Sequence, residues 1–491
     1  APARMRGTFA GVVTDGRQAW GFRDHLGYRT LFHHDGPRGV TFASEAKQVV
    51  AAAGIPREPD LAALEQVLFG NLTDDTPSAF KGVARLPKSS ILHVDAERVR
   101  VGRFWHPERL LETGSYTDDE LQERFDALMA QASARTLIGT DAVSLSGGID
   151  SPAIAAYAAP EFRRRFGRAM PALSAVFPES PSVDETPYIE AVAEHLGMEL
   201  HTYRRRAPIL EDLRAWVELV DGPVPVFIWP DALTHYRTAR DLGIRNLLNG
   251  AVAELVMDMR RHLLAHLIRA GRLGAAGREL RRQVDRGVGA RAYARQVANA
   301  FMPRSVHQAR LRRRPPKHGD RVPPWLDVAK VNELAVAKAP SGRERWRYNQ
   351  LGGFIGPGLS VEANEVAQHV TGVRARYPWA DVDLWEFFLS IPAEDKFPDP
   401  GISKSLVRRL LRGRVPDVIL DRTDKTVFNE DFLSRADYAG LRPWLVDPPE
   451  RIPGVDYALL KERIEAEDMG VFEYIWAKDL ACAHAFLDLF R

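Results

Sequence analysis

The chain has 491 residues, of which 45% are hydrophobic and 27% are charged, and its net charge is +2. This composition is close to that of an average globular protein, and it excludes a collagen-like, a largely disordered or a membrane-spanning chain. The length exceeds what one ordinary core fills, so it predicts two or three domains. The single cysteine, Cys482, offers neither a disulfide framework nor a multi-cysteine metal site. No leader segment is indicated, and we expect a cytoplasmic protein that contacts no membrane.

The N-terminal residues alternate short apolar segments with turn residues, which is typical of a β-rich layer. The segments expected to form strands are Gly7–Val13, Thr30–Phe32, Val40–Phe42 and Ser90–Val94. A helix is expected at Asp60–Leu68, with Asp60 as its N-cap. These elements predict a first, β-rich domain over residues 1–113.

From Thr117 the pattern changes to longer helices that alternate with apolar strands. Thr117 and Glu120 have the spacing of a capping box, which predicts the start of a helix that runs to Leu137. The next expected elements are a strand at Ala142–Leu145, a helix from Ser151, a strand at Pro171–Phe177, a helix at Thr186–Leu196 and a strand at Glu199–Tyr203. This alternation favours a parallel sheet in a second domain over residues 114–491, which is expected to be mainly helical from about Pro223.

A basic insertion is expected within this second domain, at about residues 260–326. Arginine dominates it from Arg260 to Arg295, and a second basic cluster runs from Arg310 to Lys317. Such runs are usually solvated helix faces, and the alternative is a surface that attracts an acidic partner or phosphates. Because neither an aromatic-interleaved nor a zinc-finger pattern accompanies the cluster, nucleic acid is not expected as a partner.

The segment Ser144–Ser151, Ser-Leu-Ser-Gly-Gly-Ile-Asp-Ser, lies between an expected strand and an expected helix. Gly147 and Gly148 let the backbone approach a phosphate closely, and N–H groups at a helix start face an anion. Asp150 supplies a carboxylate for Mg²⁺. A plain glycine turn is the alternative, but the order of these residues favours an ATP site. The residues expected to bind the nucleotide in this loop are Ser144, Ser146, Gly147, Gly148, Ile149, Asp150 and Ser151.

This loop and the strand–helix pattern around it resemble the ATP-pyrophosphatase domain of the asparagine synthetase family, whose members adenylate a carboxylate and release pyrophosphate. Asn249–Glu254 resembles the family's acidic motif, Gly372–Asp381 a later segment, and Lys404–Lys425 the closing lysine and arginine motif. The family fold implied is a parallel-sheet synthetase domain of the adenine nucleotide alpha hydrolase type, with a helical C-terminal part.

The resemblance also implies roles for single residues. Asp150 and Glu254 would hold Mg²⁺, and Lys425 would neutralise the transferring phosphate and the departing pyrophosphate. Lys404 is expected to contact phosphate or to form a surface pair. Gly250 is expected to add a nucleotide contact. Val176 and Phe177, at the end of the second expected strand, are candidates to contact adenine through backbone and ring, and a buried strand end is the equally good alternative.

The N-terminal domain resembles the family's glutaminase domain in Phe22–Phe32 and Phe42–Lys47. Glutaminases of that type use an N-terminal cysteine as the nucleophile, whereas this chain begins with Ala1 and has no cysteine before Cys482. The expectation is therefore a degenerate Ntn-glutaminase-like domain that releases no ammonia. An amine other than glutamine-derived ammonia would then capture the adenylate.

Two branches of the family capture an adenylate in this way: β-lactam synthetases and lasso-peptide cyclases. The size and basicity of the insertion favour a cyclase, which joins the N-terminal amine of a precursor core peptide to an Asp or Glu side chain and forms a macrolactam. The resemblance then implies a leader-binding protein and a leader peptidase as further partners. Amide formation on a small molecule, of β-lactam or asparagine type, and a non-catalytic binding relative are the alternatives.

The general base of this reaction is expected to be a carboxylate. Ala251 occupies the place of the tyrosine that β-lactam formers pair with a glutamate, so that pair is not intact. Glu365, with Glu362 behind it, is the candidate for the base. A solvated carboxylate on a helix face is the alternative for both residues.

Overall fold

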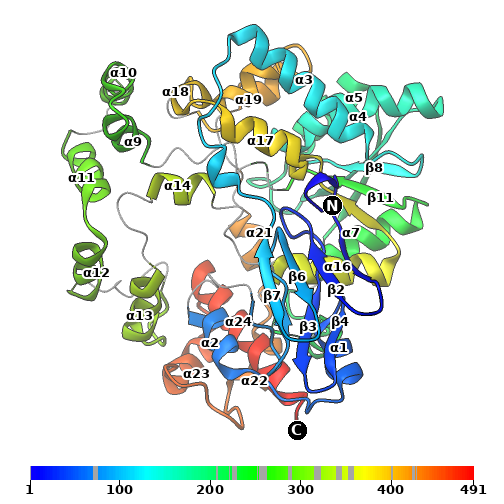
Figure 1. The fold of residues 1–491 in the computed structure, drawn as a ribbon, viewed down its shortest axis with the longest axis vertical. Coiled ribbons are helices and arrows are strands. Elements are labelled where there is room, and N and C mark those ends of the chain that lie inside the picture. The colour runs from blue at the N-terminus through cyan, green and yellow to red at the C-terminus, as the bar shows by residue number, and fades with distance from the viewer. Residues whose placement is uncertain are drawn as a thin grey trace.

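The computed structural model describes residues 2–69, 76–205, 208–220, 222–223, 229–251, 253, 262–285, 290–313, 322–338, 345–351, 359–399, 402–422, 426 and 428–491. These residues form two antiparallel sheets and one parallel sheet, with helices packed around them (Figure 1). The fold class predicted from the sequence, a β-rich N-terminal part followed by a parallel-sheet domain with a helical C-terminal part, is confirmed.

The N-terminal part contains a four-stranded sheet in the order β1-β2-β6-β7 and a three-stranded sheet in the order β4-β3-β5. The strands are β1 (Ala10–Thr14), β2 (Ala19–Arg23), β3 (Phe32–Gly36), β4 (Gly39–Ala43), β5 (Ala84–Arg85), β6 (Ser90–Val94) and β7 (Val99–Arg103). Three of them, β2, β5 and β7, were not predicted. Helices α1 (Ala46–Ala53) and α2 (Leu61–Phe69) accompany the sheets. The predicted cap of α2 is present, because the Ala63 N–H donates to Asp60 Oδ1 over 3.0 Å.

The second part is built on a five-stranded parallel sheet in the order β10-β9-β8-β11-β12. Its strands are β8 (Asp141–Ser144), β9 (Pro171–Val176), β10 (Glu199–Arg204), β11 (Asn246–Asn249) and β12 (Arg374–Arg376). The chain leaves β8 on one side toward β9 and β10, and later adds β11 and β12 on the other side. The carboxyl end of β8 therefore lies at a topological switch point, where open parallel sheets bind ligands.

Helices of the second part cover this sheet and continue to the end of the chain. Those before β11 are α3 (Asp118–Ala134), α4 (Asp150–Phe166), α5 (Thr186–Leu196), α6 (Leu213–Val220) and α7 (Trp229–Asp241). The predicted capping box of Thr117 and Glu120 is present at the start of α3, which ends before the predicted Leu137. The later helices are α16 (Leu359–Thr371), α17 (Val382–Ser390), α18 (Ala393–Lys396), α19 (Ser405–Leu410), α20 (Asp417–Leu420), α21 (Asn429–Ser434), α22 (Tyr438–Leu445), α23 (Tyr457–Ala466) and α24 (Val471–Asp488).

The region after Pro223 is mainly helical, as predicted, but it also contributes β11 and β12 to the sheet. These strands have the sequences Asn-Leu-Leu-Asn and Arg-Ala-Arg. Segments of three or four residues are too short for a period of two to be distinguished from any other pattern, so the sequence did not reveal them.

The predicted basic insertion forms a series of helices that lies beside the body of the molecule (Figure 1). These helices are α9 (Leu263–Arg269), α10 (Leu273–Val284), α11 (Ala290–Phe301) and α12 (Arg304–Arg313), and α13 (Val328–Lys338) and α14 (Arg345–Gln350) follow the predicted insertion. We call α9 to α12 the helical arm. Among the helices that the structure describes, none combines the length and the apolar character needed to cross a bilayer.

The C-terminal helix α24 closes the core of the N-terminal part. Phe80 packs against Phe486 with ring centroids 5.6 Å apart, and both residues are buried in a hydrophobic cluster that also includes Phe32 and Val49. A second cluster lies beneath the loop that follows β8 and includes Ile149 and Trp379. The first cluster therefore joins residues from both sides of the domain boundary predicted near residue 113.

Candidate functional site

The segment Ser144–Ser151 forms a loop at the carboxyl end of β8, in the middle of the parallel sheet. In the register of the sheet, Ser144 lies opposite Asn249 of β11 and opposite Leu173 of β9. The loop ends where α4 begins, at Asp150, and the buried Trp379 donates from Nε1 to the Asp150 carbonyl oxygen over 2.9 Å. The segment around Trp379, which resembles a family motif, therefore anchors the end of the loop.

Glycines are required in two places beside this loop. A Cβ at Gly250 would lie 2.8 Å from the backbone nitrogen of Ser151, and a Cβ at Gly147 would lie 2.8 Å from Cβ of Glu185. Distances this short leave no room for a side chain. Within the loop, Ser146 N donates to Ser151 Oγ over 2.9 Å, and the two hydroxyls lie 3.0 Å apart. Ser151 therefore fixes the shape of the loop.

Asp150, the predicted Mg²⁺ ligand, forms an ion pair with Lys404. The side chains are only 20% and 10% exposed, respectively, so water screens the pair little. Lys404 has a φ of 55° at the N-cap of α19, a conformation that costs free energy for a residue with a side chain. The structure thus brings together two residues that were predicted separately, and it places the ammonium group of Lys404 on the carboxylate.

A second ion pair, between Glu185 and Arg422, holds the glycine turn of the loop. Gly147 N donates to Glu185 Oε2 over 2.9 Å, and Arg422 Nη1 donates to the Gly147 carbonyl oxygen over 2.8 Å. Arg422 Nη1 also lies 2.9 Å from Glu185 Oε1, which accepts a further bond of 2.8 Å from Thr426 Oγ1. Both members of the pair are about nine-tenths buried. We call this arrangement the Glu185–Arg422 clasp.

Glu185 was not predicted as a site residue. Its neighbour Asp184 lies at the start of helix α5, where Asp184 Oδ1 accepts from Thr186 Oγ1 over 2.7 Å. The side chain of Glu185 makes no capping bond and turns toward the loop. Arg422 was noted as part of the closing motif, but nothing in the sequence connects it with a glutamate 237 residues away.

A cavity of about 210 Å³ opens beside the loop, and Ser144, Ser146 and Phe177 are among its lining residues. Phe177 and Phe428 lie with ring centroids 5.3 Å apart, and the guanidinium of Arg205 lies 4.9 Å above the Phe177 ring. Val176 ends strand β9 next to it but does not line the cavity. Aromatic and cationic groups beside a phosphate loop are suited to a nucleotide, and we call this space the loop cavity.

His235 lies in the wall of the loop cavity, and its Nδ1 is 3.0 Å from the hydroxyl of Tyr203. Burial, together with the charge of Arg205, lowers the pKa of His235 to about 4. The imidazole is therefore neutral near pH 7, and it adds a polar but uncharged group to the wall. It was not among the predicted site residues.

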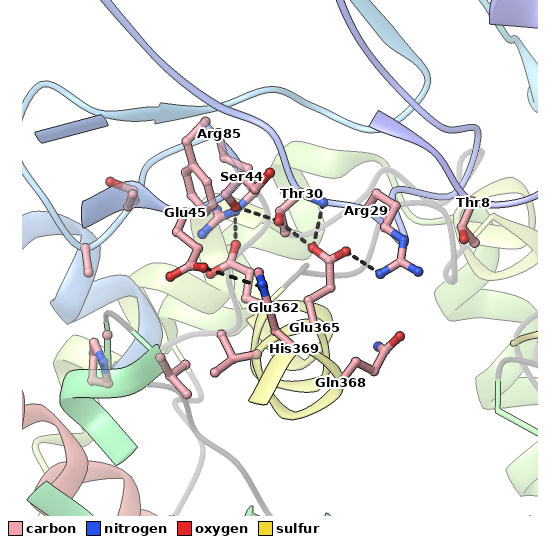
Figure 2. Close-up of a pocket in the computed structure, with 18 of the residues that line it drawn as sticks. Thr8, Arg29, Thr30, Ser44, Glu45, Arg85, Glu362, Glu365, Gln368 and His369 are labelled. Atoms are coloured by element: carbon pink, nitrogen blue, oxygen red, sulfur yellow. Dashed lines mark hydrogen bonds and ion pairs between the residues drawn. The ribbon is translucent and has the colours of Figure 1, made fainter. Parts of the chain in front are cut away.

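Glu365, the predicted base, lies in a different and larger cavity of about 620 Å³, between the N-terminal part and helix α16. Figure 2 shows its carboxylate directed at Arg29 and Thr30. Arg29 Nη1 donates to it over 2.8 Å and Thr30 N over 2.9 Å, and the Thr30 hydroxyl donates as well. Glu362 is paired in the same way with the buried Arg85. We call this space the interdomain cavity.

Helix α16 separates the two cavities, since Asn364 lines the loop cavity whereas Glu362 and Glu365 line the interdomain cavity. The structure therefore does not bring Glu365 together with the loop, and its role as the base stays a prediction. Lys425 and Glu254 lie outside the described residues, so their predicted roles also stay predictions. Ala251 is exposed, and its N–H donates to Asn249 Oδ1 over 2.8 Å.

The fold and the loop together define a class of protein. A parallel sheet with a glycine-containing loop at a switch point, leading into a helix N-terminus, is the arrangement of nucleotide- and phosphate-binding α/β proteins. Residues 124–459 match the family model described as Asparagine synthase, and residues 2–105 match the model described as Glutamine amidotransferase domain. The first match covers more than half of the chain, and the chain belongs to the asparagine synthase family.

Curated relatives agree with this assignment. The chain is 28% identical over 212 residues to asparagine synthetase [glutamine-hydrolyzing] 3 of Bacillus subtilis, a match that covers 40% of this chain and 34% of the relative. It is 30% identical over 167 residues to putative asparagine synthetases [glutamine-hydrolyzing] of Mycobacterium bovis and Mycobacterium tuberculosis, covering 32% of this chain and 25% of each relative. The matches thus cover between a quarter and about a third of the length of these relatives. The identity of Ala1 therefore does not show whether the protein has a glutaminase nucleophile.

Proposed function

We propose that the protein forms an amide bond at the expense of ATP, in the manner of the asparagine synthetases that it resembles. A carboxylate would attack the α-phosphorus of ATP to give an acyl adenylate and pyrophosphate, and an amine would then displace AMP. The observation that supports this proposal most is the Ser144–Ser151 loop, which lies at the switch point of the sheet, within the region that matches the family.

The residues of the loop suit the phosphates of ATP. Gly147 and Gly250 let the loop pack closely against Glu185 and against the start of α4, and that helix start offers N–H groups to an anion. Two cations, Lys404 and Arg422, lie within reach of the loop backbone or of Asp150 and can offset the charge that develops on departing pyrophosphate. The aromatic pair Phe177 and Phe428 is placed to receive the base.

Mg²⁺ would be held by Asp150. The described residues contain no group of three or more carboxylate, histidine or cysteine side chains that could hold a metal, so phosphate oxygens and the predicted ligand Glu254 would complete the ligand set. When bound, the ion would lower the negative charge that the phosphates present to an attacking carboxylate. Asp150 also forms the ion pair with Lys404, which holds the carboxylate in place.

The test of this proposal is ATP–pyrophosphate exchange. The full chain, incubated with ATP, labelled pyrophosphate and a carboxylate substrate, should return label to ATP only when the carboxylate is present. Aspartate with ammonium salts as the amine source tests chemistry of the asparagine type directly. No exchange with aspartate or with any peptide carboxylate would contradict the proposed function.

A second candidate is the closure of a peptide into a macrolactam, as lasso-peptide cyclases do. The helical arm supports it, because a series of basic helices beside the body offers more contact surface than an amino-acid substrate needs. The precursor peptide, a leader-binding protein and a leader peptidase would then be partners. A peptide with a free amine and an internal Asp or Glu should lose the mass of one water with ATP, whereas aspartate should give no asparagine.

A further inference from the structure

The helical arm has a charge that sets it apart from the rest of the chain. Between His262 and Arg313 the sequence contains twelve arginines, two acids, Glu279 and Asp285, and no lysine. This stretch has a formal charge of +10, whereas the whole chain carries +2, so the other residues together carry −8. A charge of this size on one substructure produces a local field that a nearly neutral protein otherwise lacks.

Half of these twelve arginines are exposed and form no ion pair within the described part of the chain. In the part of the chain that the structure describes, Arg272 pairs with Glu112 and Glu394 at the base of the arm. Six other arginines of the arm are exposed and take part in no ion pair with a described residue: Arg278, Arg281, Arg291, Arg295, Arg312 and Arg313. Guanidinium groups suit carboxylates, because two parallel N–H donors match the two carboxylate oxygens.

Helix α10 also carries an apolar stripe that nothing in the described structure covers. Leu273, Leu280 and Val284 are 67%, 42% and 53% exposed. Their spacing of seven and four residues places them on one side of the helix, and Gly277 falls on the same side. The opposite side of α10 is buried through Ala275, Ala276 and Glu279.

The neighbouring helices extend this surface. Helix α12 buries none of its residues. Val306, Ala309, Arg310 and Arg313 lie on one face of it and line a hollow of about 410 Å³. Val306 is 51% exposed, and Phe301 at the end of α11 is 43% exposed. Aliphatic residues and arginines thus alternate over the arm at helical spacing.

We propose that the arm is a docking surface for an acidic amphipathic helix of a partner polypeptide. Its leucines or similar residues would cover the stripe of Leu273, Leu280 and Val284, in the mode in which a helix lies in an apolar groove. Its glutamates or aspartates would pair with the six exposed arginines named above, among them Arg278 and Arg281. The phosphates of a nucleic acid could pair with the arginines of this surface. They would leave its exposed aliphatic side chains uncovered, because a phosphate backbone offers nothing apolar to pack against. This inference does not depend on the chemistry at the loop.

The test uses the full chain and three synthetic probes. The first is a fluorescent peptide of about 18 residues, or five helical turns, with leucines along one face and glutamates elsewhere. The second has the same composition with the leucines scattered, and the third is a DNA duplex. In fluorescence anisotropy near physiological salt, the first peptide should bind about tenfold more tightly than the scattered one, the difference expected when apolar anchors are buried.

Two pairs of variants separate docking from general charge attraction. Leu280→Gln together with Val284→Gln should reduce affinity about tenfold, whereas Leu242→Gln, at a residue that is 43% exposed outside the arm, should not. Arg278→Glu with Arg281→Glu should abolish binding, and Arg17→Glu should leave it unchanged. Equal binding of the two peptides, or tighter binding of DNA that ignores the Leu280 variant, would overturn the proposal.

Discussion

The loop after β8 and the helical arm both contain many charged side chains, but the two regions differ in whether these charges are buried and paired. At the loop, Asp150 is paired with Lys404 and Glu185 with Arg422, and these side chains are mostly buried. On the arm, six arginines are exposed and unpaired among the described residues. Charges that are buried must be compensated inside the protein, whereas exposed charges remain available to a partner. In this molecule the buried, paired charges belong to the candidate active-site loop, and the exposed, unpaired charges belong to the surface proposed to bind a partner.

The largest effect should come from the carboxylate of the loop. Asp150→Asn removes the charge with little change of shape, and we expect ATP–pyrophosphate exchange to fall by about 10² to 10³. Asp241→Asn, at an exposed aspartate, is the matched control. Thermal unfolding of the variant checks that it is folded. Normal exchange by a folded Asp150→Asn protein would show that Asp150 is not part of the site.

The next effect concerns the clasp. Arg422→Ala leaves Glu185 charged, buried and without its cation, and should lower the free energy of unfolding by about 3 kcal/mol. Arg204→Ala breaks the exposed pair with Glu179 and should change it by less than about 1 kcal/mol. Urea unfolding of both variants measures the difference. Equal effects would show that burial of the pair is energetically unimportant.

Glu365 allows the two cavities to be distinguished. Its carboxylate already accepts bonds from Arg29 and Thr30, so Glu365→Gln should lower the free energy of unfolding by about 1 to 2 kcal/mol and keep kcat within about tenfold. Chemical denaturation and steady-state kinetics on the same preparation give both quantities. A loss of kcat of about 10² or more, with stability unchanged, would instead support its predicted role as the base.

Lys396, near the base of the arm, gives a pH-dependent effect. It is 2% exposed, its Nζ donates to Gln350 Oε1 over 3.0 Å, and burial lowers the pKa of the ammonium to about 8. The unfolded chain therefore holds this proton to a higher pH than the folded protein does. Stability should rise with pH above about 8, by about 1 kcal/mol per unit, until the ordinary lysine pKa is reached.

Lys396→Met tests this linkage. The variant has no proton to lose at this position, so its stability relative to the parent should be highest below about pH 8 and should decline above it. Urea midpoints of both proteins at several alkaline pH values measure this difference. A difference that does not change with pH would show that Lys396 titrates alike in both states.

The smallest effect should come from the arm itself. Arg312→Gln with Arg313→Gln removes two exposed charges that have no partner in the described structure, so stability should change by less than about 0.5 kcal/mol. A thermal shift assay is sufficient to measure it. A large loss of stability would show that these arginines already serve the fold, and would weaken the contrast between the two regions.

Local patterns could be predicted from the sequence, whereas contacts between distant segments could not. The capping box at Thr117, the cap at Asp60 and the loop before α4 depend on residues within a few positions of each other. The Glu185–Arg422 clasp and the Arg29–Glu365 pair join residues 237 and 336 positions apart, and no local rule connects them. Glu365 was predicted as the base because it is a carboxylate, but its position on α16 places it in the interdomain cavity and not in the loop cavity.

The contact between Phe80 and the C-terminal helix has a consequence for how the protein is made. Phe80 lies against both Phe486 and Phe490, at ring distances of 5.6 and 5.8 Å. At about 5 to 20 residues per second, a ribosome needs tens of seconds to reach α24 after it has completed the early sheets. During that interval Phe80 lacks its contacts with Phe486 and Phe490. We therefore expect nascent chains that lack α24 to depend on chaperones.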